Sequence, residues 1–391
     1  MKLLYILILK LSLLFLCCFS SNTEAKDIVI GATLNLSGVN SQYSIDYKNA
    51  IDAYIESYNK LDKLKTYQLK LLVLDDQGTI SRARDNIERL ITRKQVIAII
   101  NPYQGLIGEE IIKVAVKLET LVLSSTFACE NSIISKAEKR YSYYFSTLNI
   151  YSHPVVSQLF EQLAISNENL FYFYDEKIIK RSITANNQNE MFIDTPLINL
   201  PLGTTIIINE RYVDAAIFIN NAFKSRPDFN FVVLPYVGAE VLITLLDKNV
   251  IENIRFVVDI PVHLQLPLHK EFGVLFSKEK KEIRLNSQSL KGVIAAKVIT
   301  ESVFNVVNAL KADSLIDVVT LPFQVLERMV GWVKHSTSDL DRELIIDEIR
   351  NIESYEIGLE ETISYEKNGL GLSHLWLLEI SQGQLVLRGN E

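Results

Sequence analysis

The stretch DIVIGATLNLSG, residues Asp27–Gly38, contains an apolar run from Ile28 to Leu34 that leads into an Asn-Leu-Ser-Gly loop. The run has the length and composition of a buried β-strand. Apolar residues then recur at helical spacing on one face: Ile51, Tyr54, Ile55 and Tyr58. A strand–loop–helix start favours an α/β fold. Because such sheets bind ligands beyond the carboxyl ends of their strands, the Ser37-Gly38 loop is a first candidate wall of a binding site.

An export signal is predicted before this strand. Lys2 supplies a positive start, the segment up to Phe19 is mostly apolar, and Thr23-Glu24-Ala25 offers small residues where a signal peptidase cuts. Cleavage is predicted after Ala25. The alternative is an uncleaved membrane anchor, which Lys10 and the small-residue exit disfavour. No later stretch reaches the roughly 18 apolar residues of a membrane span, so we expect a periplasmic protein with no span after cleavage.

Charge and cysteine content narrow the class of protein. The formal net charge is −7, and the predicted signal carries +1, so the mature chain is at −8. This acidity disfavours nucleic acid, which requires a basic face. Cys17 and Cys18 lie in the signal, so no internal disulfide can form in the mature chain. The remaining Cys129 is interpreted as a small packed residue rather than a reactive thiol.

About 366 residues follow the predicted cleavage site, which is enough for two domains. Strand and helix patterns alternate, which favours parallel sheets with crossover helices. The further candidate strands are Leu69–Leu74, Val96–Ile100, Leu121–Ser124, Leu170–Tyr174, Phe231–Leu234 and Arg255–Val258. One candidate helix buries Ala83, Ile87, Leu90 and Ile91. The tail differs, with short strands predicted at Glu361–Tyr365, Leu375–Ile380 and Gln384–Leu387.

Catalytic and metal motifs are missing from the sequence. It contains no GxxxxGK[ST], GxGxxG, GxSxG or HExxH pattern, and no two histidines stand at metal-ligand spacing on a helix. Asp75-Asp76 follows an apolar strand and is interpreted as a cap of the next helix rather than a metal or acid–base pair. The sequence therefore predicts no enzymatic activity, no cofactor and no metal.

Several segments, in their order along the chain, resemble the type I periplasmic substrate-binding proteins of ABC transporters, in particular the branched-chain amino-acid group. Asp27–Gly38 resembles the family's opening strand and Ser-Gly loop, and Leu71–Ile91 its second strand and helix. Leu121–Ile134 resembles the fourth strand with its small-residue loop, and Tyr141–Pro154 the passage into the second domain. The resemblance covers nearly all of the mature chain.

The resemblance implies two doubly wound α/β lobes joined by three inter-lobe crossings, near Phe145–Asn149, Phe276–Asn286 and Ser354–Glu361. The helices Gly292–Leu310, Val318–Val333 and Leu340–Ile352 would return to the first lobe. The implied division is a signal peptide at 1–25, lobe 1 at 26–146 plus 285–355, and lobe 2 at 147–284 plus 356–391. A ligand would bind between the lobes, which a hinge closes.

The resemblance also implies a binding site. In the first lobe, Tyr43 would line the ligand, while Gln104, Ser125 and Thr126 would hold an anionic group with hydroxyls and backbone N–H groups. In the second lobe the matching positions are Asp175, Tyr236 and Asp259. Asp259 lies within a residue of the acidic group that meets the ligand ammonium, and Ile260 fits that alignment equally well.

Each of these residues has a structural alternative. Tyr43 could be an ordinary loop aromatic, Gln104 a cap of a helix that begins near Glu109, and Ser125 and Thr126 turn residues. Two positions depart from the family, because Gln104 stands where a Ser or Thr is expected and Ala128 falls near a Thr. The segment 176–213, where a full helix and strand are expected, is rich in basic, Asn and Gln residues and contains Pro196 and Pro201.

The leading functional prediction is a monomeric periplasmic solute-binding protein that delivers an amino acid or small carboxylate to an ABC transporter permease. The alternative keeps the fold but makes it a sensor or accessory module that binds a protein partner. An exported enzyme is disfavoured because no catalytic constellation is found.

Overall fold

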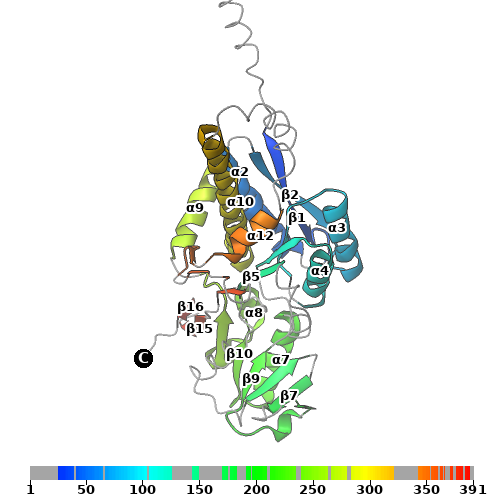
Figure 1. Cartoon of the computed structure of the whole chain (residues 1–391). Helices are drawn as coiled ribbons and strands as arrows, with labels where there is room; N and C mark the ends of the chain where they lie inside the picture. Colours follow the sequence, from blue (N-terminus) through cyan, green and yellow to red (C-terminus); the bar gives the residue numbers. More distant parts are fainter. Residues whose placement is uncertain are drawn as a thin grey trace, which may run out of the picture.

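The computed structural model describes residues 25–38, 41–64, 67–103, 105–125, 143–148, 170–174, 177–182, 191–194, 196–208, 212–234, 239–262, 266–279, 283–320, 342–352, 354–359, 362–363, 365, 370–372, 376–381 and 384–387. Two large sheets organise these residues (Figure 1). The predicted signal and Cys129 lie outside the described residues.

The first sheet has six strands in the order β14-β5-β4-β3-β1-β2, and all its pairings are parallel. Its strands are β1 (Lys26–Leu34), β2 (Tyr67–Asp75), β3 (Ala98–Asn101), β4 (Leu121–Ser124), β5 (Tyr144–Leu148) and β14 (Leu370–Leu372). The central strands β3 and β4 are buried along their whole length. This agrees with the continuous apolar runs from which strands were predicted.

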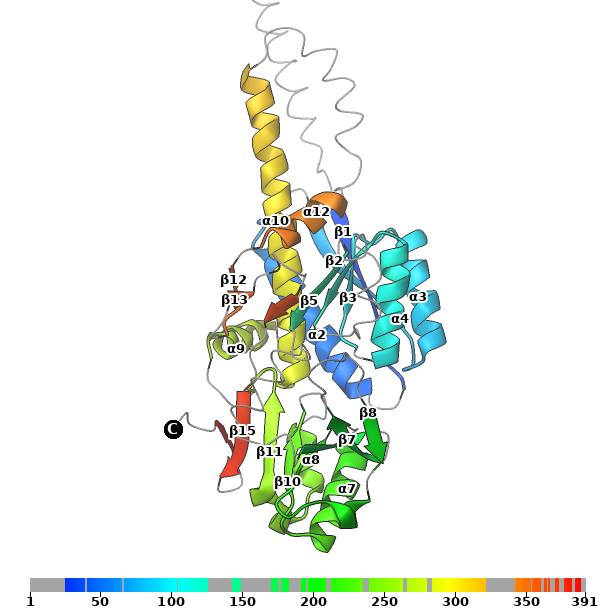
Figure 2. The ribbon, with the colours of Figure 1, turned by 60° about the horizontal axis from the view of Figure 1, so that its bottom comes forward.

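Helices cover both faces of this sheet (Figures 1 and 2). On one face lie α2 (Ser41–Lys60) and α10 (Ser287–Thr320), which pack against each other, and α12 (Arg342–Arg350) contacts α10. On the other face, α3 (Ile80–Thr92) and α4 (Gly105–Lys117) enclose a second cluster of buried apolar side chains. The four residues predicted to face the core from α3, Ala83, Ile87, Leu90 and Ile91, are all buried.

The second sheet has eight strands in the order β16-β15-β11-β10-β9-β6-β7-β8. They are β6 (Leu170–Tyr174), β7 (Lys177–Ser182), β8 (Met191–Asp194), β9 (Thr205–Ile208), β10 (Asn230–Val233), β11 (Ile254–Val258), β15 (Trp376–Ser381) and β16 (Gln384–Leu387). The central four pair in parallel, and antiparallel strands extend both edges. Its core is shared with α7 (Tyr212–Ser225), α8 (Ala239–Leu245), η3 (Leu197–Asn199) and η5 (Lys248–Asn253).

The segment 176–213 departs from helix–strand alternation, as its composition suggests. After β6 the chain turns back on itself twice, through β7 and β8, before β9 resumes the parallel order. The strands β7, β8 and β9 were not among the predicted ones. β7, which lies between β6 and the edge strand β8, carries Lys177, Lys180 and Arg181, and such a charged strand lacks the apolar signal of a buried one.

Two passages between the sheets differ in position from the predicted lobe boundaries. Helix α9 (Pro267–Glu279) falls within the range predicted for lobe 2, yet it packs against α2 and α10 and buries Leu268, Phe272 and Phe276 in their core. Strand β14, also predicted in lobe 2, pairs with β5 of the first sheet. Among the described elements, the chain thus changes sheets after β5, between β11 and α9, and between β14 and β15.

Helix α10 contains a segment, Ser287–Leu310, that is long and apolar enough to cross a membrane by length and composition alone. This stretch differs from the prediction that no segment after the signal is apolar enough for a membrane span. Most of it is buried against the rest of the protein, and α2 is its main neighbour. Burial inside an α/β domain explains an apolar helix of this kind without a membrane.

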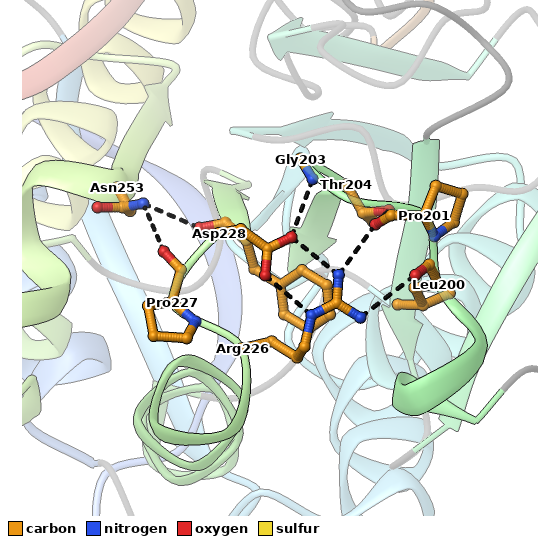
Figure 3. A network of polar contacts seen from close by, with 9 residues as sticks. Leu200, Pro201, Gly203, Thr204, Arg226, Pro227, Asp228 and Asn253 are labelled. Atoms are coloured by element: carbon orange, nitrogen blue, oxygen red, sulfur yellow. Dashed lines mark hydrogen bonds and ion pairs between the residues drawn. The ribbon is translucent and has the colours of Figure 1, made fainter.

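The loops that lead into β9 and β10 are joined by Arg226 and Asp228, and Asn253, just before β11, donates to the Pro227 and Phe229 carbonyls (Figure 3). Arg226 donates Nε and Nη2 hydrogen bonds, each of 2.8 Å, to the two oxygens of Asp228, and its guanidinium lies 4.6 Å from the Phe229 ring centroid. It also donates to the Leu200 carbonyl at 3.3 Å. The Gly203 N–H donates to Asp228 at 2.9 Å. The network fixes the amino-terminal edge of the second sheet.

This network predicts an acid-dependent loss of stability. Hydrogen bonds from Arg226 and Gly203 lower the pKa of Asp228 below its ordinary value of about 3.9. Because the pKa is lower in the folded state, the contribution is complete above about pH 4 and is lost as the pH falls through the folded value. Asp228→Asn should therefore lower the urea midpoint near pH 7, and the difference from the parent should shrink toward pH 2–3.

Asp27→Asn is the matched control, because its partner Lys70 forms an exposed ion pair, which usually contributes little. A difference between the Asp228→Asn variant and its parent that stays constant from neutral to acid pH would contradict the assignment.

Candidate functional site

The candidate site is the carboxyl-terminal edge of the first sheet, here called the first-sheet edge: the loops that follow β1, β2, β3 and β4. The loop after β1 lies against the turn after β2. The Leu36 N–H and the Ser37 hydroxyl both donate to Asp75, and the Gly38 N–H donates to Asn35 Oδ1 at 2.7 Å. A Cβ at Gly38 would lie 2.7 Å from the Gln77 carbonyl oxygen, so this approach requires glycine.

The two aspartates after β2 hold loops together rather than capping the next helix. The N-cap of α3 is Thr79, and it makes no side-chain capping bond. Asp75 instead accepts hydrogen bonds from three groups, at Leu36, Ser37 and Gln77. Burial opposes ionisation of Asp75, but the Ser37 hydroxyl and these N–H groups outweigh it, so its pKa falls below the ordinary value. The two aspartates therefore have a structural role, as predicted, but the prediction that they cap α3 is wrong.

Asp76 is fully buried and joins three strand ends. It accepts hydrogen bonds from Thr33 at the end of β1, from the Gly78 N–H, and from the Tyr103 hydroxyl at 3.0 and 3.1 Å. Burial raises the pKa of Asp76, although these donors favour the charged form. Beside it, Asn101 at the end of β3 donates to Ser124 Oγ at 3.0 Å and accepts the Tyr103 N–H. The edge is thus held by an internal polar network.

Ser125 is buried at the first-sheet edge and is bonded within the protein. Its N–H donates to the Asn101 carbonyl at 2.9 Å, and its hydroxyl shares a hydrogen bond of 2.5 Å with the Tyr47 hydroxyl. Both side chains are fully buried, and burial raises the pKa of Tyr47. In this conformation the predicted anion-holding hydroxyl therefore connects α2 to the end of β4.

The Tyr47–Ser125 contact can be tested by a double-mutant cycle. Ser125→Ala and Tyr47→Phe each remove one hydroxyl and leave the other buried without that partner, so each should destabilise the fold. The double variant should lose less than the sum of the two, with a coupling energy of about 1 kcal/mol in chemical unfolding. Strictly additive losses would show that the two hydroxyls do not act together.

The other predicted residues divide into two groups. Tyr43 is half-buried in the first turn of α2, one helical turn before Tyr47. Gln104, Thr126, Asp175 and Tyr236 lie outside the described residues. Helix α4 begins at Gly105, earlier than the start near Glu109 that was considered for it.

Asp259 directly follows β11 and is buried, with 2% of its side chain exposed. Its partner is an ammonium group of the protein itself: Lys291 Nζ of α10 lies 2.5 Å from Asp259 Oδ2, and Lys291 is also 2% exposed. Lys291 and Tyr47 were not predicted as site residues. The available signals were a lysine at the start of the apolar run after Leu290 and a tyrosine one turn beyond Tyr43.

Among the described residues, no group of three or more His, Cys, Asp or Glu side chains is placed to hold a metal ion. In the part of the chain that the structure describes, the hydrogen bonds of the first-sheet edge join groups of the protein to one another. The arrangement is that of a preorganised edge with oriented hydroxyl and amide groups, which suits recognition of a solute.

Comparison with known proteins agrees with this arrangement. Residues 27–185 match the family model described as periplasmic binding protein, which is a family of solute-binding proteins rather than enzymes. No curated protein matches the sequence significantly. The resemblance predicted from the order of motifs is confirmed for this part of the chain.

Solved structures show that the fold extends over nearly the whole chain. A possible leucine/isoleucine/valine-binding protein from Rhodopirellula baltica SH 1 has a TM-score of 0.69 at 16% identity, covering 95% of this chain and 98% of the other. A branched-chain amino acid ABC transporter protein from Thermus thermophilus with bound valine has a TM-score of 0.67 at 12% identity, covering 93% and 96%. A transporter substrate-binding protein from Streptococcus pneumoniae in complex with isoleucine has a TM-score of 0.62 at 12% identity, covering 93% and 100%.

Proposed function

We propose that the protein is a periplasmic solute-binding protein that captures an amino acid or another small carboxylate between two lobes and delivers it to an ABC transporter permease. The observation that carries the proposal is the architecture: two sheets with parallel cores, between which the described elements of the chain pass three times. The solved structures with this fold include proteins with bound valine and isoleucine. The family match over residues 27–185 supports the same function.

The proposal includes the predicted cellular context. The signal at 1–25 would be cleaved after Ala25, and the family description favours a location outside the cytoplasm. The mature protein would act as a monomer whose lobes are built around the two sheets. In place of the predicted boundaries, we assign α9 and β14 to the lobe of the first sheet, because they pack or pair there.

Two residues predicted to bind the solute have partners within the protein. The Ser125 hydroxyl, predicted to hold the anionic group, is engaged by Tyr47. The Asp259 carboxylate, predicted to meet the ligand ammonium, is engaged by Lys291, which argues against a standard α-amino acid as the solute. The same observations favour the alternative of a sensor or accessory module, in which the fold binds a protein partner and no solute enters. The alternative therefore remains the competing proposal.

A thermal-shift screen over amino acids, hydroxy acids, keto acids and small carboxylates separates the two functions. A solute at 100 times its Kd should stabilise the folded protein by about 2.7 kcal/mol, which raises the unfolding temperature. The transport function predicts at least one such solute. A protein that responds to no member of the panel would favour the accessory role.

A further inference from the structure

The ion pair between Lys291 and Asp259 is almost completely buried, and the burial of two charged groups needs an explanation. Each side chain is 2% exposed, and the ammonium nitrogen lies 2.5 Å from the carboxylate oxygen. Apart from this ion contact, no hydrogen bond to Asp259 Oδ2 is found among the described residues. Removing two ions from water is costly, and their attraction repays this cost only with good geometry and additional hydrogen bonds. Stability alone is therefore a weak explanation for the pair.

The position of the pair suggests a binding role. Asp259 stands at the carboxyl end of β11, a parallel strand of the second sheet, and ligands of open α/β sheets bind beyond such ends. A carboxylate there would form a subsite for a cation. Lys291 reaches it from α10, a helix packed against α2 beside the first sheet. Lys291, from the unit built on the first sheet, thus fills a subsite at the end of a strand of the second sheet.

The amino-terminal part of α10 is held firmly in place. Asn286 and Ser289 exchange hydrogen bonds at the start of the helix, and Asn286 also donates to Asp46 of α2 at 2.7 Å. Next to Lys291, Gly292 lies so close to α2 that a Cβ there would be 2.7 Å from the Tyr47 carbonyl oxygen. The ammonium group is therefore presented by a fixed backbone rather than by a mobile loop.

We infer that Lys291 is an internal counter-ion that occupies a cation subsite at Asp259. The inference rests on the proposed function, which supplies the carboxylate, and it adds a solute class: the captured carboxylate has no ammonium group at this position, as in a hydroxy or keto acid rather than an α-amino acid. Lys291 then determines specificity by excluding a second cation.

Chemical rescue tests the counter-ion without any knowledge of the solute. Lys291→Ala removes three carbons and the ammonium group, which n-propylammonium replaces. The cation should raise the melting temperature of Lys291→Ala, whereas n-propanol should not. The response should vanish in the Asp259→Asn/Lys291→Ala double variant. Lys297→Ala is the control on the same helix, because Lys297 pairs with the less buried Glu271 at 3.0 Å.

An equal response of Lys291→Ala and Lys297→Ala to n-propylammonium would overturn the inference. If Lys291→Ala does not fold in the cell, its refolding yield from urea with and without the cation gives the same comparison. A higher yield specific to this variant supports the inference, and an unchanged yield overturns it.

The solute class is tested on the parent chain with matched pairs, such as L-leucine and L-2-hydroxy-4-methylpentanoate. A larger thermal shift with the hydroxy acid supports the assigned class, and a larger shift with the amino acid overturns it. Absence of binding by every solute would refute the proposed function and the solute class together, while the rescue experiment would still decide the role of Lys291.

Discussion

Replacing Lys291 with methionine is expected to lower the free energy of unfolding by about 3–5 kcal/mol, because the substitution leaves the Asp259 carboxylate buried without its counter-charge. Both side chains of the pair are 2% exposed, so water cannot take the place of the ammonium group. Urea unfolding followed by circular dichroism at neutral pH measures the loss.

The matched control is Lys297→Met on the same helix, where the ion pair with Glu271 is partly exposed. Such a pair contributes about 1 kcal/mol or less, so this variant should remain close to the parent. Combining Lys291→Met with Asp259→Asn should restore part of the lost stability, since no unpaired charge stays buried. A Lys291→Met variant as stable as the Lys297→Met variant would contradict the buried-pair geometry.

Gly292→Ala should destabilise the protein by about 1–3 kcal/mol, although alanine favours a helix over glycine by about 1 kcal/mol. The added Cβ would lie 2.7 Å from the Tyr47 carbonyl oxygen and 3.2 Å from the Ala50 Cβ. These atoms belong to α2, so α10 would have to move away from its main neighbour. The urea midpoint of the variant measures this cost.

Gly273→Ala in α9 provides the opposite case for comparison. A Cβ at Gly273 meets no atom within 4 Å, so only the reduced freedom of the unfolded chain counts. That variant should gain about 0.4–1 kcal/mol. If both substitutions stabilise the protein, α2 and α10 are not in the close contact described here.

Much of the first sheet was predictable because its signals are local. Strand β4 has the predicted bounds, Leu121–Ser124, and the predicted core face of α3 is buried. A run of branched apolar residues indicates a strand, and apolar residues at helical spacing indicate a helix. Both patterns can be read within a window of about a dozen residues. The order of such segments was also enough to predict the family resemblance.

Other parts of the fold have no comparable local signal. Strand β7 is charged, and β14 has three residues, one of them a glycine. No helix was predicted at α9, whose residues were placed in lobe 2 only because they fall within 147–284, and an apolar stretch does not show which core buries it. Its partners, α2 and α10, are distant in sequence or separated from it by a loop.

The sequence predicted which positions belong to the candidate site. It could not predict which hydrogen-bond and ion-pair partners these residues have. Ser125 was singled out by its place after β4, yet its partner Tyr47 lies 78 residues earlier in the chain. Asp259 was singled out in the same way, while Lys291 was hidden in an apolar helix. Polar pairs of this kind depend on packing between distant elements, which one sequence does not specify.

Isothermal titration calorimetry tests the central claim, capture of a small solute, most directly. Mature protein should be titrated with the solute that gives the largest thermal shift and with its matched amino or hydroxy analogue. The proposed function predicts saturable binding of one solute molecule per chain. Absence of saturable heat for every solute, at concentrations where the folded protein is intact, would contradict the claim.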